Sequence, residues 1–403
     1  MEKVSPETVG LSSQRLRRID ALMQNYVDQQ KLAGVITLVA RHGKIAHWQC
    51  IGKLDVEANL PMQENTIFRI ASMTKPITSV AALMLYEEGH FQLDDPVARF
   101  IPEVAGMKVC REETATELQL VEQERPMTMR DLFLHTSGLP FASPAGSPID
   151  VLYHQADLTP ADRSLRKMVQ ALVRLPLACQ PGSVWRYGLS HDLLGYLVEV
   201  IGGMPFDAFL EQHIFTPLGM RDTGFYVPAE KHERLATVYG PADGGGLVRV
   251  DTPRVNRYTQ PRRLLDGGGG LVSTATDYLR FAQMLLNGGE LDGTRLLSRK
   301  TVELMTRNHL PPSLLPYRLG AAQLDYLAQG HGFGLGVRVM MDVAQSGVLG
   351  SEGEYGWAGS ATTVVWIDPK EEMICLLLPQ LMPTGFYPLD RQFKVLAYQA
   401  IVD

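Results

Sequence analysis

The strongest constraint on the fold is that the strand patterns gather near the two ends of the chain. Near the N-terminus, residues 34–40 and 45–48 are apolar segments on either side of a turn at residues 41–44, which is the pattern of a β-hairpin. Near the C-terminus, residues 334–341, 361–367 and 373–378 are further strand candidates, with a turn at residues 368–371. Because no strand–helix–strand rhythm runs along the chain, we expect an antiparallel sheet built from both termini.

Helical patterns flank and separate these strands. The expected helices cover residues 12–31, 77–88, 161–173, 190–201, 206–213 and 388–401. Residues 110–124 are polar and acidic, so we interpret them as an excursion at the surface. A glycine tract at residues 266–273 leads into a helix over 278–286, for which Thr276 or Ser273 is the expected N-cap. The tract lacks the residues of a phosphate-binding loop, so we interpret it as a close backbone approach near a cleft.

Length and composition indicate an ordinary globular α+β protein of two domains. At 403 residues, the chain is long enough for an α/β domain formed by residues 1–90 and 260–403 and a mainly helical domain over residues 91–259. We expect the active site in the cleft between them. An apolar content of 45% and a charged content of 20% are typical of soluble proteins. A net charge of −6 without a Lys/Arg block argues against a nucleic-acid partner.

The cysteines and the N-terminal residues indicate which metal or disulfide sites and which cellular location to expect. Cys50, Cys110, Cys179 and Cys375 lie far apart without CxxC spacing, so we expect reduced thiols and neither a zinc site nor a disulfide framework. No histidine or carboxylate cluster suggests another metal, and no cofactor is expected. Neither a signal-peptide pattern nor an apolar run of about 20 residues is visible. These features predict a cytoplasmic protein without a membrane partner, and they leave the oligomeric state open.

The sequence Ser72-Met73-Thr74-Lys75 carries the first candidate chemistry, because a serine and a lysine three positions apart fall on one face of a helix. A serine hydroxyl is a poor nucleophile until a base takes its proton, and a buried lysine can be that base. Spacing alone is weak evidence, and the chain holds a second copy, Ser164-Leu165-Arg166-Lys167. Charged neighbours make the second copy typical of a solvated helix face, whereas apolar residues flank the first.

Further motifs follow the first copy in a fixed order. They are Leu134-His135-Thr136-Ser137-Gly138-Leu139, Trp185-Arg186-Tyr187-Gly188-Leu189, residues 217–223, residues 267–276 and Gly356-Trp357-Ala358-Gly359-Ser360. In this order the chain resembles the serine β-lactamase and penicillin-binding-protein superfamily, and more narrowly the class C β-lactamase-like carboxylesterases called family VIII esterases. The resemblance covers nearly the whole chain. It implies a β-lactamase/DD-peptidase-like fold, with an antiparallel sheet flanked by N- and C-terminal helices beside a helical domain.

The resemblance also implies roles for individual residues. Ser72 would be the acylated nucleophile, and Lys75 beside it would ease the loss of the hydroxyl proton. Tyr187 would be the second member of the base and would pass the proton to the leaving alcohol. The backbone N–H groups of Ser72 and Ser360 would form the oxyanion hole, and the field of the helix N-terminus at Ser72 would favour the developing anion.

Two departures from the β-lactamase pattern bear on the substrate. Leu189 stands where β-lactamases carry asparagine, and Trp357-Ala358-Gly359 stands where they carry Lys-Thr-Gly. Exchanging an ammonium for an indole removes a partner for a substrate carboxylate and offers an apolar wall. This favours uncharged esters over carboxylate-bearing lactams. We expect Trp357, Gly359 and Leu189 to contact the substrate.

The leading interpretation is a serine carboxylesterase that hydrolyses short-chain acyl esters of small molecules through an acyl-enzyme on Ser72. An acyltransferase on the same scaffold, a weak β-lactamase or a D-amino-acid peptidase are alternatives. A pseudoenzyme that serves as a scaffold is disfavoured, because every motif residue that the chemistry needs is present. The missing G-x-S-x-G elbow argues against an α/β-hydrolase fold. His135 and Ser137 are interpreted as structural loop residues, and His191 could line the cleft.

Overall fold

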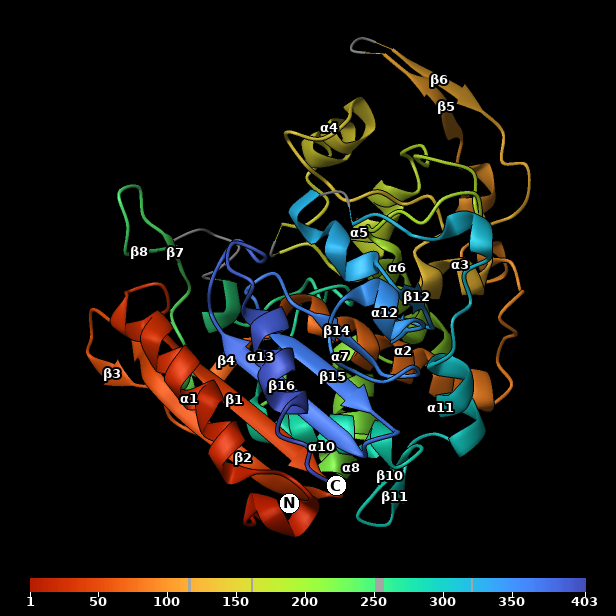
Figure 1. Ribbon diagram of the computed structural model, residues 1–403. Coiled ribbons are helices and arrows are strands. Elements are labelled where there is room, and N and C mark those ends of the chain that lie inside the picture. Colours follow the sequence, from red (N-terminus) through yellow and green to blue (C-terminus); the bar gives the residue numbers. More distant parts are fainter. Residues whose placement is uncertain (115–116, 161, 251–256, 320–321) are drawn as a thin grey trace.

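An antiparallel sheet of eight strands forms the centre of the computed structural model, which describes residues 1–114, 117–160, 162–250, 257–319 and 322–403 (Figure 1). The strand order is β12-β13-β14-β15-β16-β1-β2-β3. These strands are β12 His331–Phe333, β13 Arg338–Met340, β14 Tyr355–Ala358, β15 Val364–Asp368, β16 Met373–Pro379, β1 Gly34–Arg41, β2 Lys44–Asp55 and β3 Leu60–Pro61. β1 pairs with β16, so the two ends of the chain share one sheet and the expected antiparallel architecture is confirmed.

The first strand is buried along its whole length because helices cover both faces of the sheet. Alternate residues point to opposite faces. Ile36 and Leu38 join one core, whereas Val35 and Val39 join the second core with residues of the first and last helices. Figure 1 shows α1 (Ser13–Asp28) and α13 (Leu389–Tyr398) lying along that second face. A strand covered on both sides requires apolar residues at nearly every position, which explains its continuous apolar sequence.

The opposite face of the sheet carries the more deeply buried helices. α2 (Thr74–Glu87) is buried at most of its positions and packs against α6 (Ser190–Gly202). The other α-helices in the described part of the chain are α3 Met129–Leu134, α4 Pro148–Gln155, α5 Leu165–Leu172, α7 Phe206–Leu210, α8 Thr216–Leu218, α10 Ala275–Leu286, α11 Arg299–Met305 and α12 Val343–Ser346. Within the described ranges, no single helix is long and apolar enough to cross a membrane, although Ser190–Gly202 and Phe206–Leu218, bent by 80°, reach that length together. The division into two domains remains a prediction.

Among the described residues, four two-stranded pairs lie outside the main sheet. They are β4 Ile67–Arg69 with β9 Val272–Thr274, β5 Val109–Glu113 with β6 Leu118–Val121, β7 Tyr239–Pro241 with β8 Leu247–Arg249, and β10 Glu290–Leu291 with β11 Thr294–Arg295. The β5–β6 hairpin projects from the body of the molecule, in the region expected to be a surface excursion (Figure 1). Its strands were not foreseen, because an exposed hairpin needs no alternation of apolar and polar residues.

Several helix boundaries differ from the sequence-based expectation. α2 and α10, for example, begin at Thr74 and Ala275, three residues before the expected 77 and 278. α10 is capped by Thr274, and neither Ser273 nor Thr276 does this, because Thr274 ends β9 in an extended conformation and its hydroxyl accepts the N–H of Asp277. The helix expected over 206–213 ends at Leu210, and a π-helical turn, Glu211–Phe215, continues it. The start of the helix expected at residue 161 lies outside the described residues, and α5 itself begins at Leu165.

Candidate active site

Ser72 lies in a short 3-10 turn, Ala71–Met73, between β4 and α2. Thr74 Oγ1 donates a hydrogen bond to the carbonyl of Ala71 at 2.6 Å, and Tyr278 Oη donates to the carbonyl of Met73 at 2.8 Å. Ala71 has a φ of 44°, a left-handed conformation that costs energy for a residue with a Cβ. The surrounding structure therefore holds the residue just before Ser72 in an unusual backbone conformation.

The three predicted catalytic side chains meet at the Ser72 hydroxyl. Lys75 Nζ lies 3.2 Å from Ser72 Oγ, and Tyr187 Oη donates to the same oxygen at 2.8 Å. Lys75 comes from the first turn of α2 and is 4% exposed, whereas Ser72 and Tyr187 are half-buried. The structure thus brings two groups that can exchange a proton within hydrogen-bond reach of one partly accessible hydroxyl.

The glycine tract forms the wall behind Lys75. Lys75 Nζ donates to the carbonyl of Gly268 at 2.5 Å and lies 4.5 Å from the centroid of the Tyr187 ring. A Cβ built on Gly267 would lie 2.5 Å from the carbonyl oxygen of His191, so the tract approaches α6 more closely than any other residue would allow. The interpretation of the tract as a close backbone approach is therefore confirmed.

The turn between β14 and β15 reaches the backbone just before Ser72. A Cβ on Gly359 would lie 2.5 Å from the carbonyl oxygen of Ile70, and Thr363 Oγ1 donates to that carbonyl at 3.4 Å. Gly359 N–H donates back to Thr363 O at 2.7 Å and closes the turn that carries Ser360. Glycine at this position therefore lets the segment with Ser360 approach the nucleophile segment.

Trp357 and Leu189 are both buried, at 7% exposure each. The Trp357 ring lies 5.8 Å from the ring of Tyr187 and 5.2 Å, edge to face, from that of Phe333. Such contacts hold aromatic rings in fixed orientations. Trp357 therefore supports Tyr187 from the side, and direct contact of Trp357, Leu189 or Gly359 with a substrate remains a prediction.

Comparison with known proteins is consistent with this geometry. The Beta-lactamase family model matches residues 19–399. The chain belongs to the beta-lactamase family. It is 32% identical to Esterase EstB of Burkholderia gladioli over 389 residues, which cover 90% of this chain and 89% of EstB. It is also 36% identical to Protein Rv1367c of Mycobacterium tuberculosis over 366 residues, with the same coverage of each chain.

Solved structures of other proteins share the fold of this chain. The structure of EstCE1, described as a hydrolase with promiscuous acyltransferase activity, superposes with a TM-score of 0.80 at 25% identity, covering 96% of this chain and 99% of EstCE1. The expected β-lactamase-like fold is confirmed, and so is the resemblance to esterases that share it. This beta-lactamase-family chain is a serine hydrolase.

The histidines near the site are structural. His135 is buried among the rings of Trp185, Tyr187 and His191, and burial holds its pKa well below the ordinary 6.5. His191 is equally buried, with Nε2 at 3.1 Å from Ser79 Oγ, and does not line the cleft. The hydroxyls of Ser137 and Ser190 form a hydrogen bond of 2.8 Å. None of these side chains reaches the Ser72 hydroxyl, so the interpretation of His135 and Ser137 as structural is supported.

Sequence reasoning missed Asp192, which lies behind the catalytic lysine. Its carboxylate Oδ1 accepts the N–H of Gly268 at 3.2 Å, and it is buried in the first turn of α6. A charged residue at the start of the otherwise apolar stretch Asp192-Leu193-Leu194-Gly195 is the signal that could have identified it.

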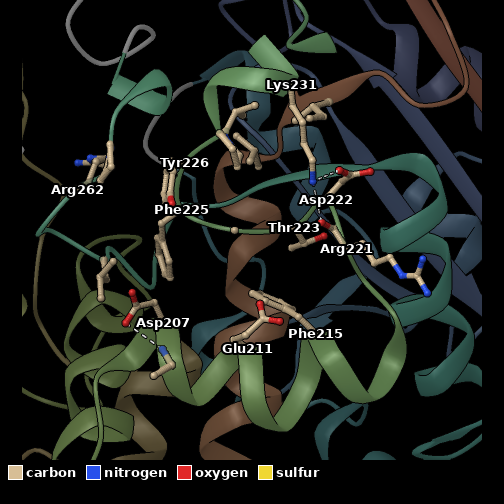
Figure 2. Close-up of a pocket in the computed structure, with 18 residues that line it drawn as sticks. Asp207, Glu211, Phe215, Arg221, Asp222, Thr223, Phe225, Tyr226, Lys231 and Arg262 are labelled. Atoms are coloured by element: carbon tan, nitrogen blue, oxygen red, sulfur yellow. Dashed lines mark hydrogen bonds and ion pairs between the residues drawn. The ribbon is translucent and has the colours of Figure 1, made fainter. Parts of the chain in front are cut away.

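A separate pocket of about 470 Å³ lies away from Ser72, Lys75 and Tyr187 (Figure 2). Phe225 and Tyr226 form one wall, and Glu211 and Phe215 from the turn after α7 form another. Lys231 Nζ pairs with Asp222 Oδ1 at 2.8 Å across its rim. The predicted catalytic residues do not line this pocket, so we assign it no part in the reaction.

Proposed function

We propose that this chain hydrolyses short-chain acyl esters of small molecules through an acyl-enzyme on Ser72. The observation that carries the proposal is the convergence of Lys75 Nζ, at 3.2 Å, and Tyr187 Oη, at 2.8 Å, on the Ser72 hydroxyl. The esterase relatives in the same family support the reaction class.

Acylation begins when Ser72 Oγ attacks the ester carbonyl carbon. The hydroxyl proton passes to the Lys75–Tyr187 pair as the new bond forms, because both groups already lie within hydrogen-bond reach. Tyr187 then delivers a proton to the departing alkoxide, which leaves as an alcohol. Because Tyr187 is half-buried, its hydroxyl can meet a leaving group that approaches from solvent.

The negative oxygen of the tetrahedral intermediate needs donors that are already in place. We assign this role to the backbone N–H groups of Ser72 and Ser360. The support is the contact of Gly359 with the Ile70 carbonyl, which brings the Ser360 segment to the nucleophile segment. A water molecule then attacks the acyl carbon while the same groups take its proton. The bond between that carbon and Ser72 Oγ breaks, the carboxylic acid leaves, and the proton passes back to Ser72 Oγ.

The wall beside the nucleophile favours uncharged substrates. Trp357 stands where related β-lactamases carry a lysine, and its ring packs against Tyr187 and Phe333. An indole offers no charge to a substrate carboxylate. We therefore assign Trp357, Gly359 and Leu189 to the apolar contact surface for the acyl or alcohol group.

Acyl transfer to an alcohol is the second candidate, supported by the acyltransferase activity that EstCE1 is described as having. The deciding experiment follows the release of p-nitrophenol from the acetate and butyrate esters, with and without an added alcohol, while both products are quantified. Hydrolysis alone supports the esterase, whereas an ester formed with the added alcohol supports the transferase. No release from either ester would contradict both. A cytoplasmic location remains a prediction from the sequence.

A further inference from the structure

Asp192 is connected to the catalytic lysine through one glycine. The Asp192 carboxylate accepts the N–H of Gly268 at 3.2 Å, and the carbonyl of Gly268 accepts a hydrogen bond from Lys75 Nζ at 2.5 Å. Asp192 therefore lies two hydrogen bonds behind the amine that faces Ser72. The side chain reaches this place from α6, whereas Lys75 belongs to α2.

Hydrogen bonds from two helices fix the position of Gly268. The peptide group between Gly267 and Gly268 is held at both ends, because Thr78 Oγ1 donates to the carbonyl of Gly267 at 2.7 Å while the N–H of Gly268 donates to Asp192. A Cβ on Gly268 would lie 2.5 Å from Asp192 Oδ2, so any larger residue there would displace the carboxylate from its present position. Two helices thus fix the residue whose carbonyl anchors Lys75.

Placing a carboxylate here is unfavourable for the fold. Burial, reinforced by the negative charge of Asp266, raises the pKa of Asp192 to about 6, and the positive charges of Arg257 and of Lys75 in its protonated form only partly oppose the rise. Asp266 is itself paired with Arg257 at 3.0 Å and Arg262 at 3.3 Å. An ionised aspartate retained against such a cost needs a reason beyond packing.

We propose that Asp192 is a positioning residue for Lys75. It fixes Gly268, whose carbonyl holds the amine at the Ser72 hydroxyl, and its negative charge stabilises the positive charge that develops on Lys75 as the proton arrives. The proton moves from Ser72 Oγ to Lys75 Nζ, and Asp192 itself exchanges none. The aspartate of a Ser-His-Asp triad acts on its histidine in the same way. The inference rests on the proposed role of Lys75 as part of the base.

The charged and titratable groups around Asp192 define the expected pH dependence. They are Lys75 on α2, Asp266 at the start of the glycine tract, Arg257 paired with Asp266, and the neighbouring His191, whose pKa burial holds well below 6.5. As the pH falls through about 6, Asp192 takes up a proton and its charge is lost. The rate of acylation should therefore decline over that range.

The test compares Asp192→Asn with Asp277→Asn. Asp277 is a matched control, because it is also buried and also accepts a backbone N–H, from Asp222 at 2.7 Å, but it does not contact the catalytic residues. We expect Asp192→Asn to lower kcat for p-nitrophenyl butyrate by about 10- to 100-fold with little change in KM. The decline of kcat/KM near pH 6 should disappear in this variant and persist in Asp277→Asn.

Thermal unfolding at pH 8 separates positioning from structural support. A raised aspartate pKa means that the neutral form is favoured in the fold, so stability falls as the pH rises from the unfolded value of 3.8 through about 6. Asparagine removes that cost, and Asp192→Asn should melt at or above the wild-type temperature while being slower. Wild-type kcat and pH profile, or a loss of activity accompanied by a lower Tm, would overturn the inference.

Labelling keeps this test distinct from that of the proposed function. A fluorophosphonate should label Ser72 of the wild-type protein. If Ser72 is labelled and Asp192→Asn behaves as wild type, the role of Asp192 is wrong while the proposed reaction stands. If wild-type protein is labelled on another serine, the proposed function itself fails.

Discussion

Two segments of this chain share the same Ser-x-x-Lys spacing and have different environments. In the first, Lys75 Nζ approaches Ser72 Oγ to 3.2 Å and the lysine is 4% exposed. In the second, Ser164 Oγ accepts the backbone N–H of Lys167 at 3.3 Å, and the Lys167 side chain is exposed. One hydroxyl faces an amine, whereas the other caps a helix.

The difference arises from where each serine lies relative to its helix. Ser164 is the N-cap of α5, with an extended conformation that turns its hydroxyl toward the free backbone N–H groups of the first turn. Ser72 precedes α2 within a 3-10 turn, and Tyr187 from a distant segment completes its surroundings. The spacing permits a serine–lysine contact, and the neighbouring elements decide whether it forms.

Of the changes that distinguish the two segments, removal of the nucleophile should lower kcat the most. Ser72→Ala should lower kcat for p-nitrophenyl butyrate by about four powers of ten or more, because no acyl-enzyme can form. Ser164→Ala should retain a rate near wild type. Mass spectrometry should find a serine-directed phosphonate on the peptide that contains Ser72, and a label at Ser164 would reverse the assignment of the two segments.

Removing either member of the base should have the next largest effect. Lys75→Ala and Tyr187→Phe should each lower kcat by about two to four powers of ten, the usual range for a lost general base. Lys167→Ala is the matched control in the second segment and should leave kcat unchanged. Near-full activity of Tyr187→Phe would show that Tyr187 does not transfer the proton.

The Ser72 site also has a wall that the Ser164 segment lacks, and altering it should change selectivity. A charge-assisted hydrogen bond is worth about 1.5–3 kcal/mol, or on the order of ten- to a hundred-fold in kcat/KM. Trp357→Lys should shift the ratio of kcat/KM values toward the anionic lactam nitrocefin and away from neutral esters. Total activity should fall, because the ring contacts with Tyr187 and Phe333 are lost. Efficient wild-type turnover of nitrocefin would contradict this account of Trp357.

The smallest expected effect is on stability. Here the Ser164 segment should be the sensitive one and the Ser72 segment the tolerant one, the reverse of their effects on activity. Ser164→Ala should lower the free energy of unfolding by about 1 kcal/mol, because α5 loses its N-cap. Ser164→Asp should restore most of that loss, since a carboxylate can accept the same N–H. Ser72→Ala should leave the denaturant midpoint close to wild type. An unchanged midpoint in Ser164→Ala would show that the cap is not formed in solution.

Local patterns predicted much of the fold and of the site. The hairpin at residues 34–48, the strands β15 and β16 and the helices α1, α2, α6 and α13 were expected, because apolar periodicity reflects which face of an element is buried. The strand expected over 334–341 was wrong in its first half, because residues 334–337 form the turn that joins β12 to β13. Helix ends were less well predicted. The cap of α10 fell on Thr274 because β9 delivers that residue in an extended conformation, and strand pairing is not a local property.

The sequence by itself indicated the antiparallel class and most of the strand candidates through residue type and periodicity, and the resemblance of its motifs to a known family pointed to the three side chains proposed for catalysis. Only the tertiary structure decided which serine meets a lysine, and that β1 pairs with β16. It also placed Asp192 behind Lys75 through Gly268. These contacts join segments far apart in the chain, and their geometry depends on how α2, α6 and the glycine tract pack together, which no short stretch of sequence specifies.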